Sequence, residues 1–108
     1  MRFHENFEWD AAKERLNLAK HKISFDLAAE ILGDEEADIY HIDEFDETHS
    51  AGEDRYVTMG SHPSDRSIIL IDCWTDRSTD SRQITRILSA RRADRHERKR
   101  YAKEIWGT

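Results

Sequence analysis

The sequence predicts an α+β domain, in which two helices precede an antiparallel sheet of three to four strands and a last helix closes the chain. Three observations lead to this fold class. Apolar residues recur at helical spacing in the first third, runs rich in β-branched and aromatic residues fill the middle, and a basic segment with helix-capping spacing ends the sequence. Helices and strands that are segregated along a chain in this way are typical of α+β domains.

The length of the chain favours one domain spanning residues 1–108, because a chain of this size buries roughly two thirds of its unfolded surface in one core. The longest aliphatic run, residues 68–71, is far shorter than the roughly 20 apolar residues of a membrane-spanning helix. No signal peptide opens at residues 1–5, so we expect a soluble, cytoplasmic protein. Cys73 is the only cysteine, which excludes an internal disulfide.

The first helix is expected to begin after Asp10, whose side chain is suited to cap it. Its apolar positions recur every three or four residues, at Ala12, Leu16, Ala19 and Ile23. Ser24 then opens a second, short helix that reaches Leu32 and stops at Gly33. The two helices are therefore joined by a tight turn at residues 21–23.

Strand-like composition marks the middle of the chain. Residues 55–61 and 66–76 flank the sequence His-Pro-Ser-Asp and predict an antiparallel hairpin. Residues 82–89 follow a polar turn and predict a third strand. Residues 37–45 have apolar side chains on both faces of any strand, so their alternation is imperfect and they are the weakest strand candidate.

The last helix is expected to begin at Asp94, which has capping-box spacing from Glu97. It also belongs to the most basic part of the chain. Residues 1–76 carry 7 basic and 19 acidic side chains, whereas residues 77–108 carry 10 basic and 4 acidic ones. Because residues 30–54 hold 11 acidic side chains and no Lys or Arg, the molecule should present one negative and one positive surface, each suited to a partner.

Three separated blocks of the sequence resemble the BrnT family of bacterial toxins, the ribonuclease half of a type II toxin and antitoxin pair. They are "FEWDAAKERLNLAKHKISFDLAAEIL" at the front, "GEDRYVTMG" in the middle, and "TDR" followed by "TRILSARRADRHERKRY" at the end. The resemblance implies a compact sheet flanked by helices like that of RelE-type toxins, and RNA cleavage without a metal ion or other cofactor. It also implies an oligomer with a small BrnA-like antitoxin that carries a ribbon-helix-helix DNA-binding domain.

The chain departs from the family pattern at three positions. Lys22 stands where the family usually has Gly, which can alter the turn between the first two helices. Arg92 stands in place of Lys and keeps the charge, and Asp94 stands in place of Thr and keeps the ability to cap a helix.

RNA cleavage by its own 2′-hydroxyl needs a base for that proton, an acid for the leaving 5′-oxygen, and positive donors around the phosphate. Arg77, Arg86 and Arg91 are the candidate donors, because a guanidinium holds two phosphate oxygens at once and stays charged. Arg86 is an odd number of residues away from both Ser89 and Arg91, so in a regular strand it would lie on the face opposite to these two. These residues can serve one site only if the strand ends or bends between them.

Two further candidate catalytic residues have a structural alternative. His21 is a candidate general base, or an imidazolium that stabilises the end of the first helix through its dipole. Glu97 is a candidate general acid or base, or only the partner of Asp94 in the capping box.

The last helix supplies the candidate RNA-binding residues. Arg98 and Arg100 either steer phosphates or only solubilise the surface. Tyr101 either stacks on a base or packs with its hydroxyl at the surface. The six histidines have no metal-ligand spacing, so we predict no metal site. Two hypotheses remain: a ribonuclease toxin, or a non-catalytic module that binds nucleic acid or protein through the C-terminal arginines.

Overall fold

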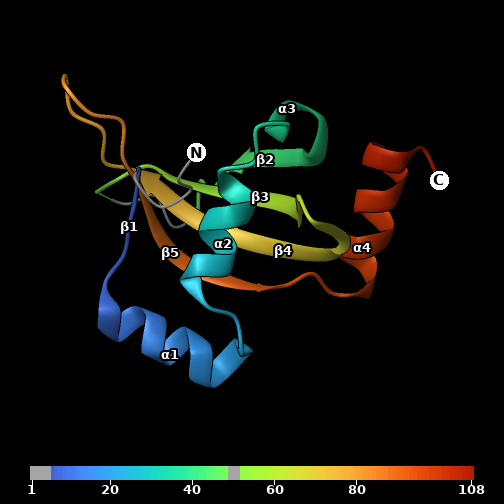
Figure 1. Cartoon of the computed structure of the whole chain (residues 1–108), viewed down its shortest axis with the longest axis horizontal. Coiled ribbons are helices and arrows are strands. Elements are labelled where there is room, and N and C mark those ends of the chain that lie inside the picture. Colours follow the sequence, from blue (N-terminus) through green and yellow to red (C-terminus); the bar gives the residue numbers. More distant parts are fainter. Residues whose placement is uncertain (1–5, 49–51) are drawn as a thin grey trace.

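The computed structural model describes residues 6–48 and 52–108. Over these residues the chain is α+β, as predicted, with the sheet between helices (Figure 1). The elements follow in the order β1 (Phe7–Glu8), α1 (Ala11–His21), α2 (Phe25–Leu32), α3 (Ala37–Tyr40), β2 (His41–Phe45), β3 (Arg55–His62), β4 (Asp65–Asp76), β5 (Thr85–Arg92), α4 (Arg95–Tyr101) and a π-helical turn, η1 (Ala102–Trp106). No helix of the described part has the length and apolar character needed to cross a membrane.

The sheet corrects the predicted strand count and layout. Its five described strands have the order β1-β5-β4-β3-β2, and β1 pairs with β5 in parallel, so the sheet is mixed and departs from the RelE-like arrangement that was expected. β1 has only two residues, too few for the alternation that identifies a strand in sequence. The segment 37–45 is also not one strand, since α3 occupies its first half and β2 its second.

The turn between α1 and α2 follows the capping pattern of the sequence. Asp10 accepts hydrogen bonds from two backbone N–H groups of α1, and Ser24 accepts one from Leu27 of α2. Lys22 ends α1 in the left-handed conformation, with a φ of 62°. This conformation costs a residue with a Cβ more than it costs glycine, the residue that the resemblance leads one to expect at this position.

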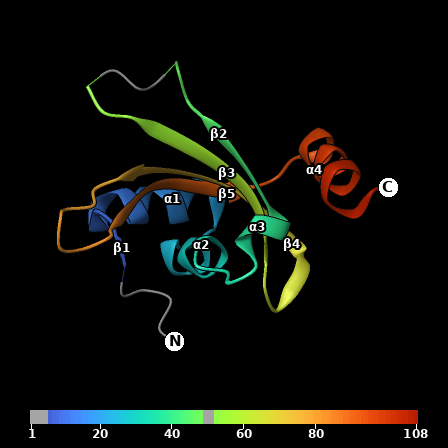
Figure 2. The ribbon, with the colours of Figure 1, turned by 90° about the horizontal axis from the view of Figure 1, so that it is seen from above.

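The helices divide between the two faces of the sheet. Seen edge-on in Figure 2, α1 and α2 lie on one side and α4 lies at one end of the other side. The α2 face holds the larger buried cluster, which consists of Ile23, Phe25, Ala28, Ala29, Ile31, Leu70, Ile87 and Ala90. The α4 face holds a smaller one of Met59, Ile69, Ala93 and Tyr101. Part of the α4 face is therefore left open.

A register shift in β5 explains how Arg86 can share a strand face with Ser89 and Arg91 although it is an odd number of residues away from both. The β4–β5 ladder pairs Cys73 with Ser89 but the next residue, Trp74, with Ile87, so that Leu88 is extra. An extra residue of this kind is a β-bulge and resets the alternation of the strand. The three residues Arg86, Ser89 and Arg91 pair with Thr75, Cys73 and Ile71, which are alternate residues of β4. They consequently share the open face.

β1 pairs only with the first two residues of β5, Thr85 and Arg86. Farther along the strand, a side chain of α1 covers this edge. The Asn17 amide donates to the Ala90 carbonyl at 2.8 Å and accepts from the Ala90 N–H at 3.1 Å, as a neighbouring strand would. It also donates to the carbonyl of Ile23 at 2.9 Å. Asn17 is only 7% exposed, so these bonds fix the end of α1 against β5 beside Ser89 and Arg91.

Candidate functional site

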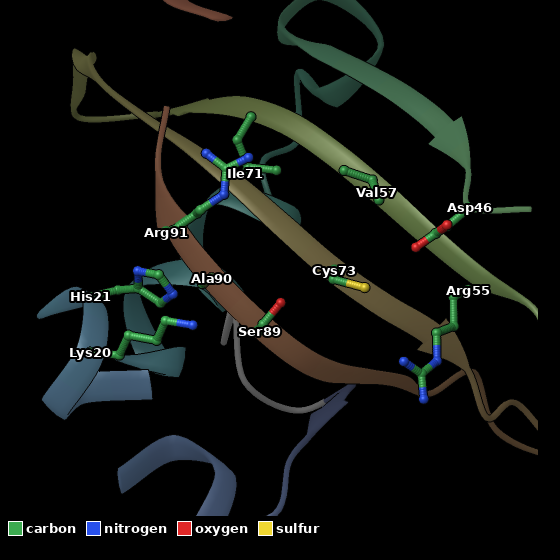
Figure 3. Close-up of a pocket in the computed structure, with 10 residues that line it drawn as sticks. All are labelled: Lys20, His21, Asp46, Arg55, Val57, Ile71, Cys73, Ser89, Ala90 and Arg91. Atoms are coloured by element: carbon green, nitrogen blue, oxygen red, sulfur yellow. The ribbon is translucent and has the colours of Figure 1, made fainter. Parts of the chain in front are cut away.

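The open face of the sheet contains a cavity of about 590 Å³, hereafter the central pocket. It is lined by residues of α1, β3, β4 and β5 and of the segment after β2: Lys20, His21, Asp46, Arg55, Val57, Ile71, Cys73, Ser89, Ala90 and Arg91. In Figure 3, Lys20, His21 and Arg91 lie toward one end, Asp46 and Arg55 lie toward the other, and Cys73 and Ser89 lie between them. The apolar strand residues form a floor and the charged ones a rim.

The last turn of α1 brings two of these side chains to the rim. Lys20 and His21 follow Asn17 by three and four residues, which places all three on one side of the helix. Because Asn17 is bonded to the backbone of Ala90, Lys20 and His21 are held over β5. His21 is also the last residue of the helix.

Arg91 is held in place by Glu97. Its two terminal nitrogens donate to the two carboxylate oxygens of Glu97 at 2.7 and 2.9 Å. This bidentate geometry fixes the plane of the guanidinium. The hydrogen bond from Arg91 lowers the pKa of Glu97 to about 2, with a contribution from the Asp94 backbone N–H.

Glu97 is therefore a positioning residue in this geometry. A carboxyl group with so low a pKa is a weak base, and it holds no proton to donate near neutral pH. Its carboxylate also completes the capping box, accepting from the Asp94 N–H at 2.8 Å while the Asp94 side chain accepts from the Glu97 N–H at 2.8 Å. The prediction that Glu97 transfers protons is replaced by this role.

The pocket has an excess of positive charge. Among the lining residues, Lys20, Arg55 and Arg91 are cations and Asp46 is the one carboxylate. Glu97 and Glu53 pair with Arg91 and Arg55 from outside the lining. The Cys73 thiol on the floor stays protonated, because burial raises its pKa above its ordinary value. The arrangement suits a small anionic group, such as one phosphate of a polyanion, more than a neutral ligand.

The other two candidate arginines do not reach this pocket. Arg86 donates to Glu8 of β1 at 2.7 Å, and Arg77 donates to Glu53 at 3.3 Å near the far end of the strands. The Arg77 backbone bonds to Ile84, and the strand from there to Arg91 spans about 20 Å at roughly 3.3 Å per residue. The three arginines therefore do not converge on one phosphate as expected. Of the three, only Arg91 lines the central pocket.

The predicted RNA-binding residues of the last helix differ from one another in burial and in hydrogen-bond partners. The Tyr101 side chain is fully buried, and its hydroxyl contacts the Ser61 hydroxyl and donates to the Tyr40 carbonyl, each at 2.7 Å. Its hydroxyl is therefore not at the surface, and its ring offers no face for a base. Arg100 donates to Glu44 at 2.5 Å and to Glu104 at 3.0 Å. Arg98 is exposed and donates to the Ser67 carbonyl at 3.3 Å.

Three charged pocket residues were missed as site candidates, Lys20, Asp46 and Arg55, whereas Ser89 had been weighed together with Arg86 and Arg91. Lys20 and Arg55 lie inside sequence blocks that resemble the BrnT family, and the spacing of Lys20 from Asn17 is visible in the sequence. The alternation of Arg55, Val57 and Met59 also places Arg55 on one strand face. Asp46 gives no such signal, because only the pairing of β2 with β3 brings it near.

The described residues hold no group of three or more His, Cys, Asp or Glu side chains placed to bind a metal ion. A sequence model of a protein family, described as "Ribonuclease toxin, BrnT, of type II toxin-antitoxin system", matches residues 9–97. The match includes α1 and every lining residue of the central pocket. No curated protein matches the chain closely enough to count as a relative.

Proposed function

The chain belongs to the BrnT family of ribonuclease toxins of type II toxin-antitoxin systems, and from this premise we propose that it cleaves RNA internally, without a metal ion, in the central pocket. The observation that carries the proposal is the cluster of Lys20, His21, Arg55 and Arg91 around one cavity of the open sheet face. Such a cluster can hold a single RNA phosphate and stabilise the charge that grows on it during cleavage.

In the proposed reaction the 2′-oxygen of the RNA attacks the adjacent phosphorus. The bond from phosphorus to the 5′-oxygen breaks, which leaves a 2′,3′-cyclic phosphate on one product and a 5′-hydroxyl on the other. Asp46 takes the proton from the 2′-hydroxyl, because a carboxylate is normally deprotonated at neutral pH. His21 as imidazolium gives a proton to the departing 5′-oxygen. The two residues lie toward opposite ends of the pocket (Figure 3), as an in-line displacement requires.

The cations take the place that a metal ion has in other nucleases. Arg91 and Arg55 donate to the non-bridging phosphate oxygens, and Lys20 adds charge beside His21. Three cations around one carboxylate would repel a divalent ion more than they would bind it. Glu97 keeps Arg91 aligned and transfers no proton.

The family implies a protein antitoxin as partner. We propose that it is a BrnA-like protein with a ribbon-helix-helix domain, that it forms an oligomer with this chain, and that the cytoplasm is where both act. We also propose that residues 1–108 form one domain, since the central pocket combines residues from α1, β3, β4 and β5.

The test is cleavage of a 5′-labelled RNA oligonucleotide by the purified chain in excess chelator. We expect defined fragments that end in a 2′,3′-cyclic phosphate, and no cleavage where the 2′-hydroxyl is replaced by hydrogen. Fragments with a free 3′-hydroxyl, or activity that appears only with added magnesium, would exclude this mechanism. Binding of RNA without any cleavage would favour the non-catalytic module.

The roles of the two proton-transfer groups are tested by Asp46→Asn and His21→Gln. Each should lower the cleavage rate by about 100-fold or more. Asp46→Asn should remove the acidic limb of the pH profile and His21→Gln the basic limb. Equal loss with an unchanged pH profile would assign both residues to binding.

A further inference from the structure

A second cavity, of about 630 Å³, lies on the side of α4 that faces away from the central pocket. We call it the outer groove. It runs between the β3–β4 turn and the last helix and is lined by Arg66, Ser67, Ile69, Arg95, Arg98, Lys99, Ala102 and Trp106. It shares no lining residue with the central pocket. The proposed cleavage reaction gives it no role.

The outer groove combines an apolar floor with a rim of cations. Ile69, Ala102 and Trp106 supply the apolar surface, and Trp106 is 43% exposed. Between described residues, ion pairs neutralise arginines 66, 77, 86, 91 and 100. In that same part of the chain, none involves Arg95, Arg98 or Lys99 of the groove. The groove therefore gathers three cations of the basic C-terminal segment, Arg95, Arg98 and Lys99, that no ion pair between described residues neutralises.

Helical spacing separates the two sides of α4. Residues 98 and 99 follow residue 95 by three and four positions and precede residue 102 of η1 by four and three, so the four form one stripe, whereas Glu97 and Arg100 lie on the opposite side. That opposite side borders a small cavity that also contains Glu44 and Arg91. In this small cavity Arg91 and Arg100 are paired with Glu97 and Glu44, so an RNA strand that left the central pocket toward the outer groove would meet no cation there outside an ion pair. A continuous RNA path through both cavities is thus disfavoured.

We propose that the outer groove is the docking site for an acidic, amphipathic segment of the protein antitoxin. Aliphatic side chains of that segment would cover Ile69, Ala102 and Trp106, and its carboxylates would pair with Arg95, Arg98 and Lys99. Opposite charge on the two partners speeds their encounter, and an apolar centre with a charged rim is the usual anatomy of a protein interface. The proposal rests on the proposed function only in taking the partner to be an antitoxin.

The charge requirement is tested with the antitoxin that is encoded together with this chain. The double variant Arg95→Glu with Lys99→Glu reverses the groove, and Arg92→Glu with Lys103→Glu is the matched control, since it makes the same change of net charge outside the groove. We expect the groove variant to lose about 10-fold or more in antitoxin affinity, and the control to lose much less. Equal affinities of the groove variant and the native chain would overturn the proposal.

RNA cleavage by the same proteins shows whether a negative result contradicts the docking proposal or the proposed function. The docking proposal expects both double variants to cleave RNA at the native rate without the antitoxin. If the groove variant keeps its antitoxin affinity and loses RNA affinity, the groove is an RNA subsite and the proposal is wrong. If no protein cleaves RNA, the proposed function fails, while the antitoxin affinities still decide the docking site.

The chemistry of the occupant is tested by photo-crosslinking. A benzophenone amino acid in place of Ala102, inside the groove, should crosslink to an antitoxin peptide with more Asp and Glu than Lys and Arg. The same group in place of Lys103, outside the groove, is the control. Crosslinks to a basic peptide, or equal crosslinking from both positions, would contradict an acidic occupant. Because neither substitution reverses a charge, this measurement also covers the case in which the double variant fails to fold.

Discussion

The two faces of the sheet are built from alternate residues of the same strands, yet they differ in what covers them. The α2 face is closed by helices over a continuous apolar cluster. The opposite face is covered only at one end, by α4, and its uncovered part carries the cations of the central pocket. The closed face therefore stabilises the fold, and the open face is left to bind. Substitutions on the first should change stability, and substitutions on the second should change activity.

The largest effect is expected on the closed face, from Phe25→Ala. Phe25 is fully buried and packs edge-on against Trp9 at 6.1 Å between ring centroids. Its truncation should lower the free energy of unfolding by about 3–5 kcal/mol, because transfer and cavity costs add. Urea denaturation measures the change, and Phe45→Ala, at a Phe that is 47% exposed, is the control. Similar losses for both would refute the contrast in packing.

Arg91→Ala should give the complementary result on the open face. Removing a donor to the growing phosphate charge is expected to lower kcat/KM for RNA cleavage by about 100-fold. The loss of the half-exposed pair with Glu97 should change stability by no more than about 1 kcal/mol. Arg92→Ala is the control, because Arg92 pairs with Leu70 and faces the other side of the sheet. A thermal transition that collapses in Arg91→Ala would make Arg91 structural.

A buried acid on the closed face allows a test by pH. Asp72 is fully buried, and neither carboxylate oxygen has a hydrogen-bond partner within the described chain, so burial raises its pKa well above the ordinary 3.8. As pH rises above that value, the unfolded chain releases this proton and the folded chain retains it. Stability should then fall by up to about 1.4 kcal/mol per pH unit until the folded pKa is reached.

The contribution of Asp72 is isolated by the Asp72→Asn variant. The difference in unfolding free energy between variant and native chain should grow in favour of the variant as pH rises from 4 to 7. Other carboxylates, such as Asp34 with its lowered pKa, have the opposite pH dependence, but they cancel in this difference. A difference that is constant with pH would mean that Asp72 titrates equally in the folded and unfolded chain.

The smallest effect is expected at the turn between α1 and α2, which lie on the same side of the sheet. Lys22→Gly should raise the free energy of unfolding by about 0.5–1 kcal/mol, because glycine adopts the left-handed conformation without the Cβ penalty. RNA cleavage should not change, since the turn keeps its shape. Ala19→Gly, within α1, should instead lower stability by about 1 kcal/mol. Thermal unfolding measures whether stability rises in Lys22→Gly and falls in Ala19→Gly.

The features that local sequence could predict are those decided by a few neighbouring residues. Asp10, Ser24 and Asp94 cap their helices as predicted, because capping depends on spacing within one turn. The hairpin of β3 and β4 was also predicted from composition. In contrast, β1 has two residues and exists only because β5 lies beside it.

The central pocket was predicted only in part, for a similar reason. His21 and Arg91 were identified, but the arginines were expected to act together, and Glu97 was considered as an acid or base. Their actual partners come from elements that only the fold brings together, such as Glu8 of β1 for Arg86. Arg55 and Asp46 join the pocket through strand pairing, which no local pattern of residues encodes.

The extra residue at Leu88 has a consequence for comparing members of this family. In a relative without this extra residue the strand would alternate regularly, and the residues that match Arg86 and Arg91 would still share one face. If the two chains were aligned without a gap at Leu88, the residue set against Arg91 would instead face the side of the sheet that α2 covers. A gap at this one position therefore preserves the faces of the strand, and omitting the gap exchanges them. Functional residues should be transferred between relatives by their cross-strand neighbours, Ile71 and Cys73, and not by counting along the chain.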